Sequence, residues 1–145
     1  MNSSIKNINS TTFSQYGYII RYDEGRNENF QVVLRENDAA GWRIAVSKIT
    51  ISHVCKLARH PNSMESFEPV NGVALLCVAP PETPECHEVF LLDKPVCLYK
   101  NVWHCAFTLS EFSLVKVCEN VTVQSEEYNL KSSEIRIAVL NKPLG

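Results

Sequence analysis

The sequence predicts an all-β protein, a barrel or sandwich of short strands with few or no long helices. Short apolar runs recur along the chain and are separated by turn-forming residues. Apolar and polar residues alternate from Trp42 to Ser47, with the period of two that is typical of a half-buried strand. No long segment has the 3.6-residue period of an amphipathic helix. These observations together indicate β structure throughout.

The apolar runs fix the expected strands. A short helical turn, capped by Thr11 or Thr12, precedes the first of them. The segment 80–85 contains three prolines and is expected to be a loop, because proline cannot donate a hydrogen bond within a sheet. In chain order, we expect strands at 18–22, 30–34, 42–47, 49–57, 73–79, 87–92, 96–99, 102–109, 112–117 and 134–140.

The run 73–79 is continuously apolar, so both of its faces should be covered. A barrel interior would cover one face. The other face requires either a second internal sheet or a partner subunit.

Length and composition indicate one domain, residues 1–145, that can bury a core of its own. Residues 1–12 are polar, and we expect them to be flexible and to be neither a signal peptide nor an anchor. The net charge of -2 argues against a nucleic-acid surface, and no run approaches the roughly 20 apolar residues of a membrane span. The six cysteines lack Cys-x-x-Cys spacing, which predicts reduced thiols and a cytoplasmic protein.

A histidine, a carboxylate and a glycine follow one another at a distinctive spacing. Four residues separate His60 from Glu65, and six more separate Glu65 from Gly72. Gly72 would supply the turn, because glycine enters the region of positive φ freely.

A second turn leads to another histidine. Asn101 lies in the segment 98–104, three residues before His104. Asparagine tolerates left-handed backbone geometry, so this turn can return the chain into a strand that carries His104.

These two stretches resemble the paired motifs of the cupin superfamily, and in particular those of the ureidoglycolate lyases. The matching residues are Arg-His-Pro at 59–61, Phe-x-Pro-x-x-Gly at 67–72, Asn-Val-Trp-His at 101–104 and Phe-Ser-Gln-Tyr-Gly-Tyr-Ile-Ile at 13–20. The resemblance covers residues 57–107 best. Ala58 stands where cupins carry the first histidine of a His-x-His pair. The resemblance implies a cupin-type β-barrel or jelly roll, a homodimer, and a lyase of allantoin degradation in purine catabolism.

The resemblance also implies that His60 and Glu65 come from neighbouring strands and point into one barrel, where they can share a ligand. It further implies roles for particular residues. Two imidazoles and a carboxylate suit a divalent transition metal (Ni, Mn or Zn), with His60, Glu65 and His104 as its ligands. Ureidoglycolate is a small carboxylic acid, so Lys56 and Lys100 are expected to bind its carboxylate. Lys56 has the parity of Ala58 and His60 along an unbroken strand, so if those two face the barrel interior, Lys56 is a pocket residue too. His104, Lys100 and His60 are the expected catalytic residues for release of glyoxylate and urea.

Three other interpretations stand beside this one. The histidines and glutamate can be remnants, with His104 a core residue that satisfies a backbone group. The chain can be a divergent cupin that binds a small carboxylic acid or sugar acid without turnover. A metal-dependent cupin oxygenase or isomerase is less favoured, because those proteins keep the full His-x-His pair. Among the neighbours, we expect Trp103 to be a packing residue, Arg59 to face outward with an acidic partner, and Cys105 to point away from His104.

Overall fold

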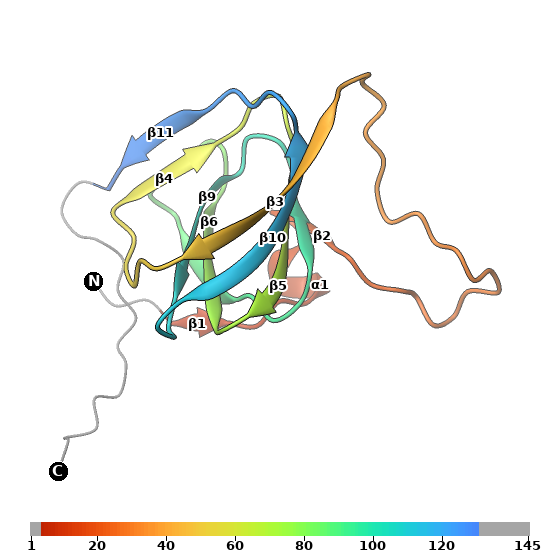
Figure 1. Ribbon diagram of the computed structural model, residues 1–145, viewed down its shortest axis with the longest axis horizontal. Helices are drawn as coiled ribbons and strands as arrows, with labels where there is room; N and C mark the ends of the chain where they lie inside the picture. Colours follow the sequence, from red (N-terminus) through yellow and green to blue (C-terminus); the bar gives the residue numbers. More distant parts are fainter. Residues whose placement is uncertain (1–3, 131–145) are drawn as a thin grey trace, which may run out of the picture.

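Two β-sheets pack face to face in the computed structural model, which describes residues 4–130 (Figure 1). The one helix of these residues is α1 (Ser10–Phe13). The first sheet has the order β1 (Ile5–Lys6), β7 (Glu88–Leu91), β6 (Ala74–Ala79), β9 (Trp103–Thr108), β4 (Lys56–Arg59), β11 (Glu126–Asn129). The second has the order β2 (Gly17–Ile19), β8 (Val96–Leu98), β5 (Glu65–Asn71), β10 (Ser113–Asn120), β3 (Trp42–Ile49). The all-β prediction is confirmed.

Most of the expected strands are present. Three expectations need correction, and a fourth concerns residues outside the described part of the chain. Residues 30–34 form no strand, and the segment 49–57 contains a loop before β4. The capping residue of α1 is Asn9, whose side chain accepts hydrogen bonds from the backbone of Thr11 and Thr12. The expected strand 134–140 lies outside the described residues.

The main core lies between the two sheets, and the alternation of strand residues selects its members. On β6 and β9 the inward residues are separated by outward ones, as a period of two requires. The buried core includes Ile8, Phe13, Tyr16, Phe67, Leu76, Val78, Phe90, Leu98, Val102, Val115 and Val117.

A second apolar cluster covers the opposite face of the six-stranded sheet. It contains Leu75 and Cys77 of β6 and Trp103 and Phe107 of β9, together with Val54 from the loop that precedes β4. β6 is therefore buried on both faces within one chain. Of the two alternatives for the second face of the run 73–79, a partner subunit is therefore not required to bury β6.

The N-terminal segment, expected from its polar sequence to be flexible, contributes a strand and buried side chains to the fold within the described residues. β1 pairs in parallel with β7, with Ile5 opposite Val89. Ile8 and Phe13 are almost fully buried in the main core. Apolar residues spaced through a polar sequence thus fasten this segment to the barrel.

Both turns named by the motifs have the expected backbone. Gly72 has φ of 80°, and a Cβ atom there would lie 2.4 Å from the carbonyl oxygen of Phe112. Asn101 has φ of 72°, the left-handed region that asparagine tolerates. Its backbone N–H donates to the carbonyl of His60 at 3.1 Å, which ties the two motif segments together.

β3 shows an unexpected polarity. Ala45 and Ser47 face the barrel interior, whereas Trp42, Ile44 and Val46 face outward and are 67%, 55% and 63% exposed. All residues from Trp42 to Lys48 are exposed, so neither face of this part of β3 is buried. Its large apolar residues lie on the face away from the cavity, whereas a half-buried strand turns them inward.

All six cysteines are free thiols, and Cys105 lies in the outer cluster, away from His104 as expected. Within residues 4–130, no helix has the length and apolar character needed to cross a membrane.

Candidate metal centre in the barrel

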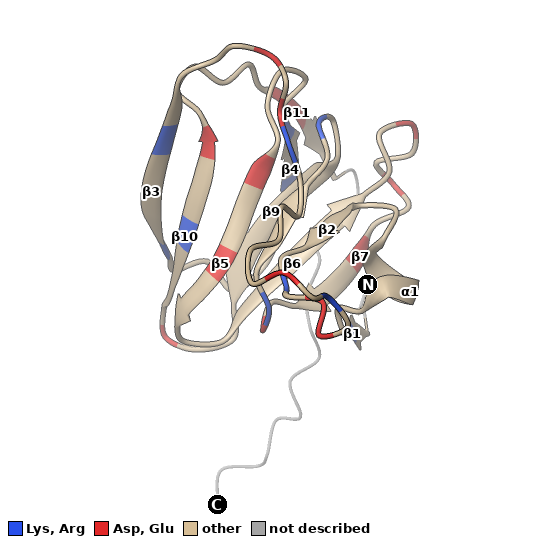
Figure 2. Cartoon of the chain, turned by 90° about the vertical axis from the view of Figure 1, so that its right-hand side faces the viewer, with Lys and Arg blue, Asp and Glu red and all other residues tan. Residues whose placement is uncertain are grey.

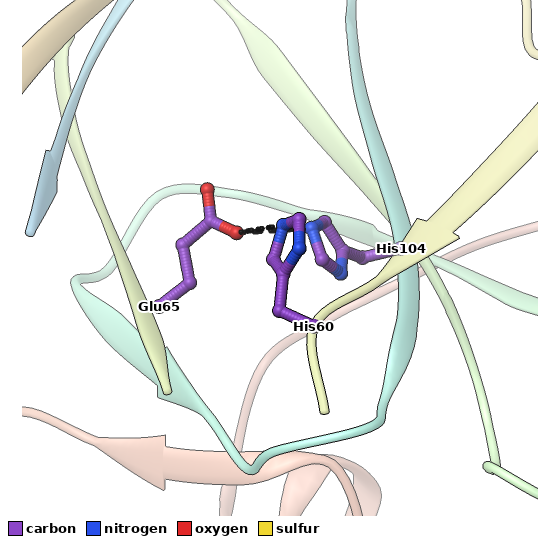
Figure 3. Close-up of side chains that lie close together, drawn as sticks. All are labelled: His60, Glu65 and His104. Atoms are coloured by element: carbon purple, nitrogen blue, oxygen red, sulfur yellow. Dashed lines mark ion pairs between the residues drawn. The ribbon is translucent and has the colours of Figure 1, made fainter. Parts of the chain in front are cut away.

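Three side chains from separate elements meet inside the barrel (Figure 3). His60 follows the end of β4, Glu65 begins β5, and His104 lies on β9. One ligand atom from each lies within 4.8 Å of the other two. The proximity of these three residues, the central expectation from the sequence, is thus observed.

Both imidazole rings are held in the same tautomer. Nδ1 of His60 lies 3.0 Å from the carbonyl oxygen of Gln124, and Nδ1 of His104 lies 3.0 Å from that of Val102. A carbonyl oxygen can only accept, so each Nδ1 must carry a hydrogen and donate it. In the neutral ring, Nε2 then keeps its lone pair, which is the form that ligates a metal.

The two Nε2 atoms approach a single oxygen. Oε1 of Glu65 lies 3.0 Å from Nε2 of His60 and 3.1 Å from Nε2 of His104. That oxygen is buried and accepts no well-aligned hydrogen bond, despite these short distances. Three electron-pair donors directed at a common point repel one another unless a cation lies between them. The donor set therefore fits a divalent transition metal, with carbonyl groups orienting both histidines.

The charges in the cluster depend on one another. Burial alone would raise the pKa of Glu65, but the imidazoles of His104 and His60 oppose burial and lower it to about 2. The pKa of His60 is raised, chiefly by its interaction with Glu65. With no metal bound, the carboxylate of Glu65 thus favours the protonated form of His60.

A cavity of about 220 Å³ opens beside Glu65. Its walls are mainly apolar, with Ser47, Glu65 and Glu119 as the polar lining residues. The lining residues are Ala45, Ser47, Ile49, Glu65, Phe67, Ala106, Val115, Val117 and Glu119. This volume lies below the roughly 300–1,000 Å³ of pockets for drug-sized ligands, so only a small molecule fits.

An ion pair at the edge of this cavity was not expected from the sequence. Glu119 lies directly across the strand pair from Glu65, and its Oε2 accepts from Nε and Nη2 of Arg43 at 3.0 and 2.6 Å. Arg43 has the same parity along β3 as Ala45 and Ser47, which places it on the cavity side. The sequence does show the alternation along β3. Because apolar residues normally face inward, however, it indicated that Trp42, Ile44 and Val46 rather than Arg43 face the interior.

The two expected substrate lysines lie apart from the cluster contacts. Lys56 is exposed and pairs with Glu127 at 3.0 Å. It shares a strand face with Ala58, as parity predicts, but this end of β4 is open to solvent, so Lys56 is not a pocket residue. Nζ of Lys100 lies 2.7 Å from Glu36 and 3.5 Å from Asp38.

The remaining expectations concern packing. Arg59 faces outward, pairs with Glu126 at 2.6 Å and stacks on the Trp103 ring at 4.4 Å. Trp103 is buried and donates its indole N–H to the carbonyl of Pro81 at 3.0 Å. Ala58 lies directly opposite His104 in the β4–β9 pair, where it contributes no ligand atom.

Comparison with solved structures agrees with this architecture. A dTDP sugar isomerase from Desulfovibrio desulfuricans G20 aligns with a TM-score of 0.54 and 16% identity, over 81% of this chain and 82% of its own. The fold is a cupin-type β-barrel. Oxalate decarboxylase from Bacillus subtilis, a protein with Mn(II) centres, aligns with a TM-score of 0.45 and 14% identity, over 63% of this chain and 24% of its own. No family model and no curated protein matches the sequence.

Proposed function

We propose that this protein is a metal-dependent cupin lyase that splits ureidoglycolate into glyoxylate and urea. The observation that carries the proposal is the convergence of His60, Glu65 and His104 on one point, with both histidines presenting a lone pair at Nε2. The motif resemblance supplies the substrate, and the small cavity beside Glu65 is compatible with it.

The residues of the chain divide the work as follows. His60, Glu65 and His104 would hold a divalent ion (Ni, Mn or Zn), which supplies Lewis acidity to substrate oxygens. Phe67 packs edge-to-face against His104, with the ring centroids 5.6 Å apart, and would hold this ring in place. Glu119, the second carboxylate of the cavity, is placed to accept the hydroxyl proton of the substrate. The carbonyl of glyoxylate then forms, the carbon–nitrogen bond breaks, and the departing nitrogen takes up a proton to give urea.

The deciding experiment is an assay of urea and glyoxylate release from racemic ureidoglycolate. We expect turnover after addition of Mn²⁺, Ni²⁺ or Zn²⁺ and its loss on treatment with a chelator. The two products should form in equal amounts. Binding of the ion without turnover under any of these conditions would contradict the lyase proposal and favour a non-catalytic cupin that binds a small carboxylic acid. The observation that favours this second function is the open cavity beside the cluster, which can hold a small acid without any reaction.

Two cations are candidates for the substrate carboxylate. The guanidinium of Arg43 has five N–H donors, and Glu119 engages it through one oxygen, so Arg43 can bind a second carboxylate. Lys100 is already bound to two acidic side chains and is the weaker candidate. Arg43→Met should raise KM for ureidoglycolate about tenfold or more and change kcat by less than about tenfold, because ground-state contacts appear in KM. Lys100→Met should raise KM less.

Steady-state kinetics of the two variants, measured side by side, check this order. Lys56→Met is the matched control, because Lys56 is exposed and pairs with Glu127, and it should leave both constants unchanged. A larger increase in KM for Lys100→Met than for Arg43→Met would contradict this order and assign the carboxylate to Lys100.

A further inference from the structure

A long connection leaves the barrel between β2 and β3. Residues 20–41, which we call the arm, contain no helix or strand and extend away from both sheets (Figure 1). Connections of this length without structure of their own are uncommon in compact domains and usually have a function. Phe30 is 81% exposed and Val32 is 47% exposed, so the arm presents apolar side chains to solvent.

The arm nevertheless has a defined shape. The hydroxyl of Tyr22 donates to the carbonyl of Glu28 at 2.6 Å, and the N–H of Asp23 donates to the side chain of Gln31 at 2.7 Å. At its base, Glu36 pairs with Lys100 of the barrel. These contacts form the tip and anchor the base, but they leave Phe30 uncovered.

The strip formed by Trp42, Ile44 and Val46 is a second uncovered apolar surface. It lies on the outer face of the five-stranded sheet, on the terminal strand of that sheet within the described residues. Figure 2 shows β3, β10 and β5 side by side, with charges few and separated along β3. An exposed apolar terminal strand is a hazard for aggregation unless something covers it.

The two surfaces are complementary. Both surfaces are apolar, with Phe30 and Val32 exposed on the arm and three exposed side chains on the strip, and Lys48 is the one charged residue of β3 on the strip's side. The tip of the arm projects away from its own strip, although the base of the same arm lies beside Trp42. A second copy of the chain offers both missing surfaces at once, since a two-fold arrangement pairs each arm with the strip of the other copy.

The apolar area is adequate for such a pair. The five exposed side chains of the arm and the strip present on the order of 600 Å² per copy, so a two-fold pair would cover about 1,200 Å², the lower limit for stable interfaces. Other arm atoms would add to this area.

We propose that the protein is a two-fold homodimer in which the arm of each copy covers the Trp42–Ile44–Val46 strip of the other. This interface differs from the run 73–79 considered in the sequence, and it does not depend on the activity of the barrel site.

The test is the molar mass of the full chain, measured by light scattering during size-exclusion chromatography at micromolar concentration. The wild type should have twice the 16.4 kDa chain mass. Ile44→Lys, which alters the strip, and Phe30→Asp, which alters the arm, should each increase the dissociation constant of the dimer at least tenfold. Leu109→Lys, at an exposed apolar residue outside both surfaces, is the control and should remain dimeric.

Circular dichroism should give all three variants the wild-type spectrum, because each change is at an exposed side chain. A monomeric wild type overturns the proposal. So does a dimer that tolerates Ile44→Lys, since its interface lies elsewhere. A dimer that Ile44→Lys breaks but Phe30→Asp leaves intact overturns the role of the arm.

Discussion

His104→Asn should lower kcat for ureidoglycolate roughly 100-fold or more, the largest effect that we expect from one substitution. The change removes one of the three candidate ligands of the cluster. It also removes the ring N–H that donates a hydrogen bond to the carbonyl of Val102. Metal content should fall with activity, because a missing ligand weakens the site directly. Rates of urea release at saturating substrate, together with elemental analysis of the purified protein, measure both effects.

His87→Asn is the control for this experiment. His87 lies in the loop before β7 and is not a member of the cluster. The control should keep wild-type kcat and metal content, and both variants should keep the wild-type circular dichroism spectrum. If His104→Asn retained more than a tenth of the wild-type kcat, His104 would be a core residue, as the alternative interpretation of the sequence holds.

Metal binding should strengthen as the pH rises from about 5 to about 8. The pKa of His60 is raised, so below it the ring carries a proton at Nε2 that a metal must displace. Displacing one proton changes the apparent affinity about tenfold per pH unit. The shift in thermal unfolding midpoint produced by Mn²⁺, Ni²⁺ or Zn²⁺ should therefore be small at pH 5 and large at pH 8.

The metal-free protein should respond to pH in the opposite sense over this range. Because the pKa of His60 is higher in the folded state, its stabilising effect is complete below about pH 6.5 and is lost as the pH rises through the raised value. The pKa of Glu65 is lowered to about 2 in the folded state. Its contribution to stability is therefore complete above about pH 4.3 and is lost as the pH falls toward 2. The Glu65 term is on the order of 3 kcal/mol, which acid unfolding should reveal.

His60→Asn provides the check on the assignment. The variant lacks the displaceable proton, so any metal response that remains should depend much less on pH. Metal-induced stabilisation of the wild type that is equally strong at pH 5 and pH 8 would contradict proton displacement from His60.

The sequence was sufficient for the class of fold and for the three members of the cluster. His60, Glu65 and His104 could be identified because their spacing to Gly72 and Asn101 encodes turns, and both turns have the positive φ that those residues favour. Lys56 was misplaced for a different reason. Parity predicts on which face of a strand a side chain lies. It cannot predict where along the strand that face becomes open to solvent.

Arg43 and the N-terminal segment illustrate the same limit. The rule that apolar residues face inward assumes that one chain covers its own surfaces, and β3 does not follow that assumption. Ile8 and Phe13 are buried although their neighbours are polar, because pairing of β1 with β7 depends on a partner more than 80 residues away. Neither contact leaves a local signal in the sequence.

The burial of β6 on both faces has a consequence for the two histidines. β9, which carries His104, is hydrogen-bonded along its whole length to β6 and lies between two apolar layers, so its backbone can open only when the barrel does. His60 follows a four-residue strand near the edge of the sheet and depends on contacts from Asn101 and Gln124. The cluster thus joins a histidine on a fully paired central strand to one that follows a short strand, and we expect His60 rather than His104 to be the side chain that shifts when ions of different radius are bound.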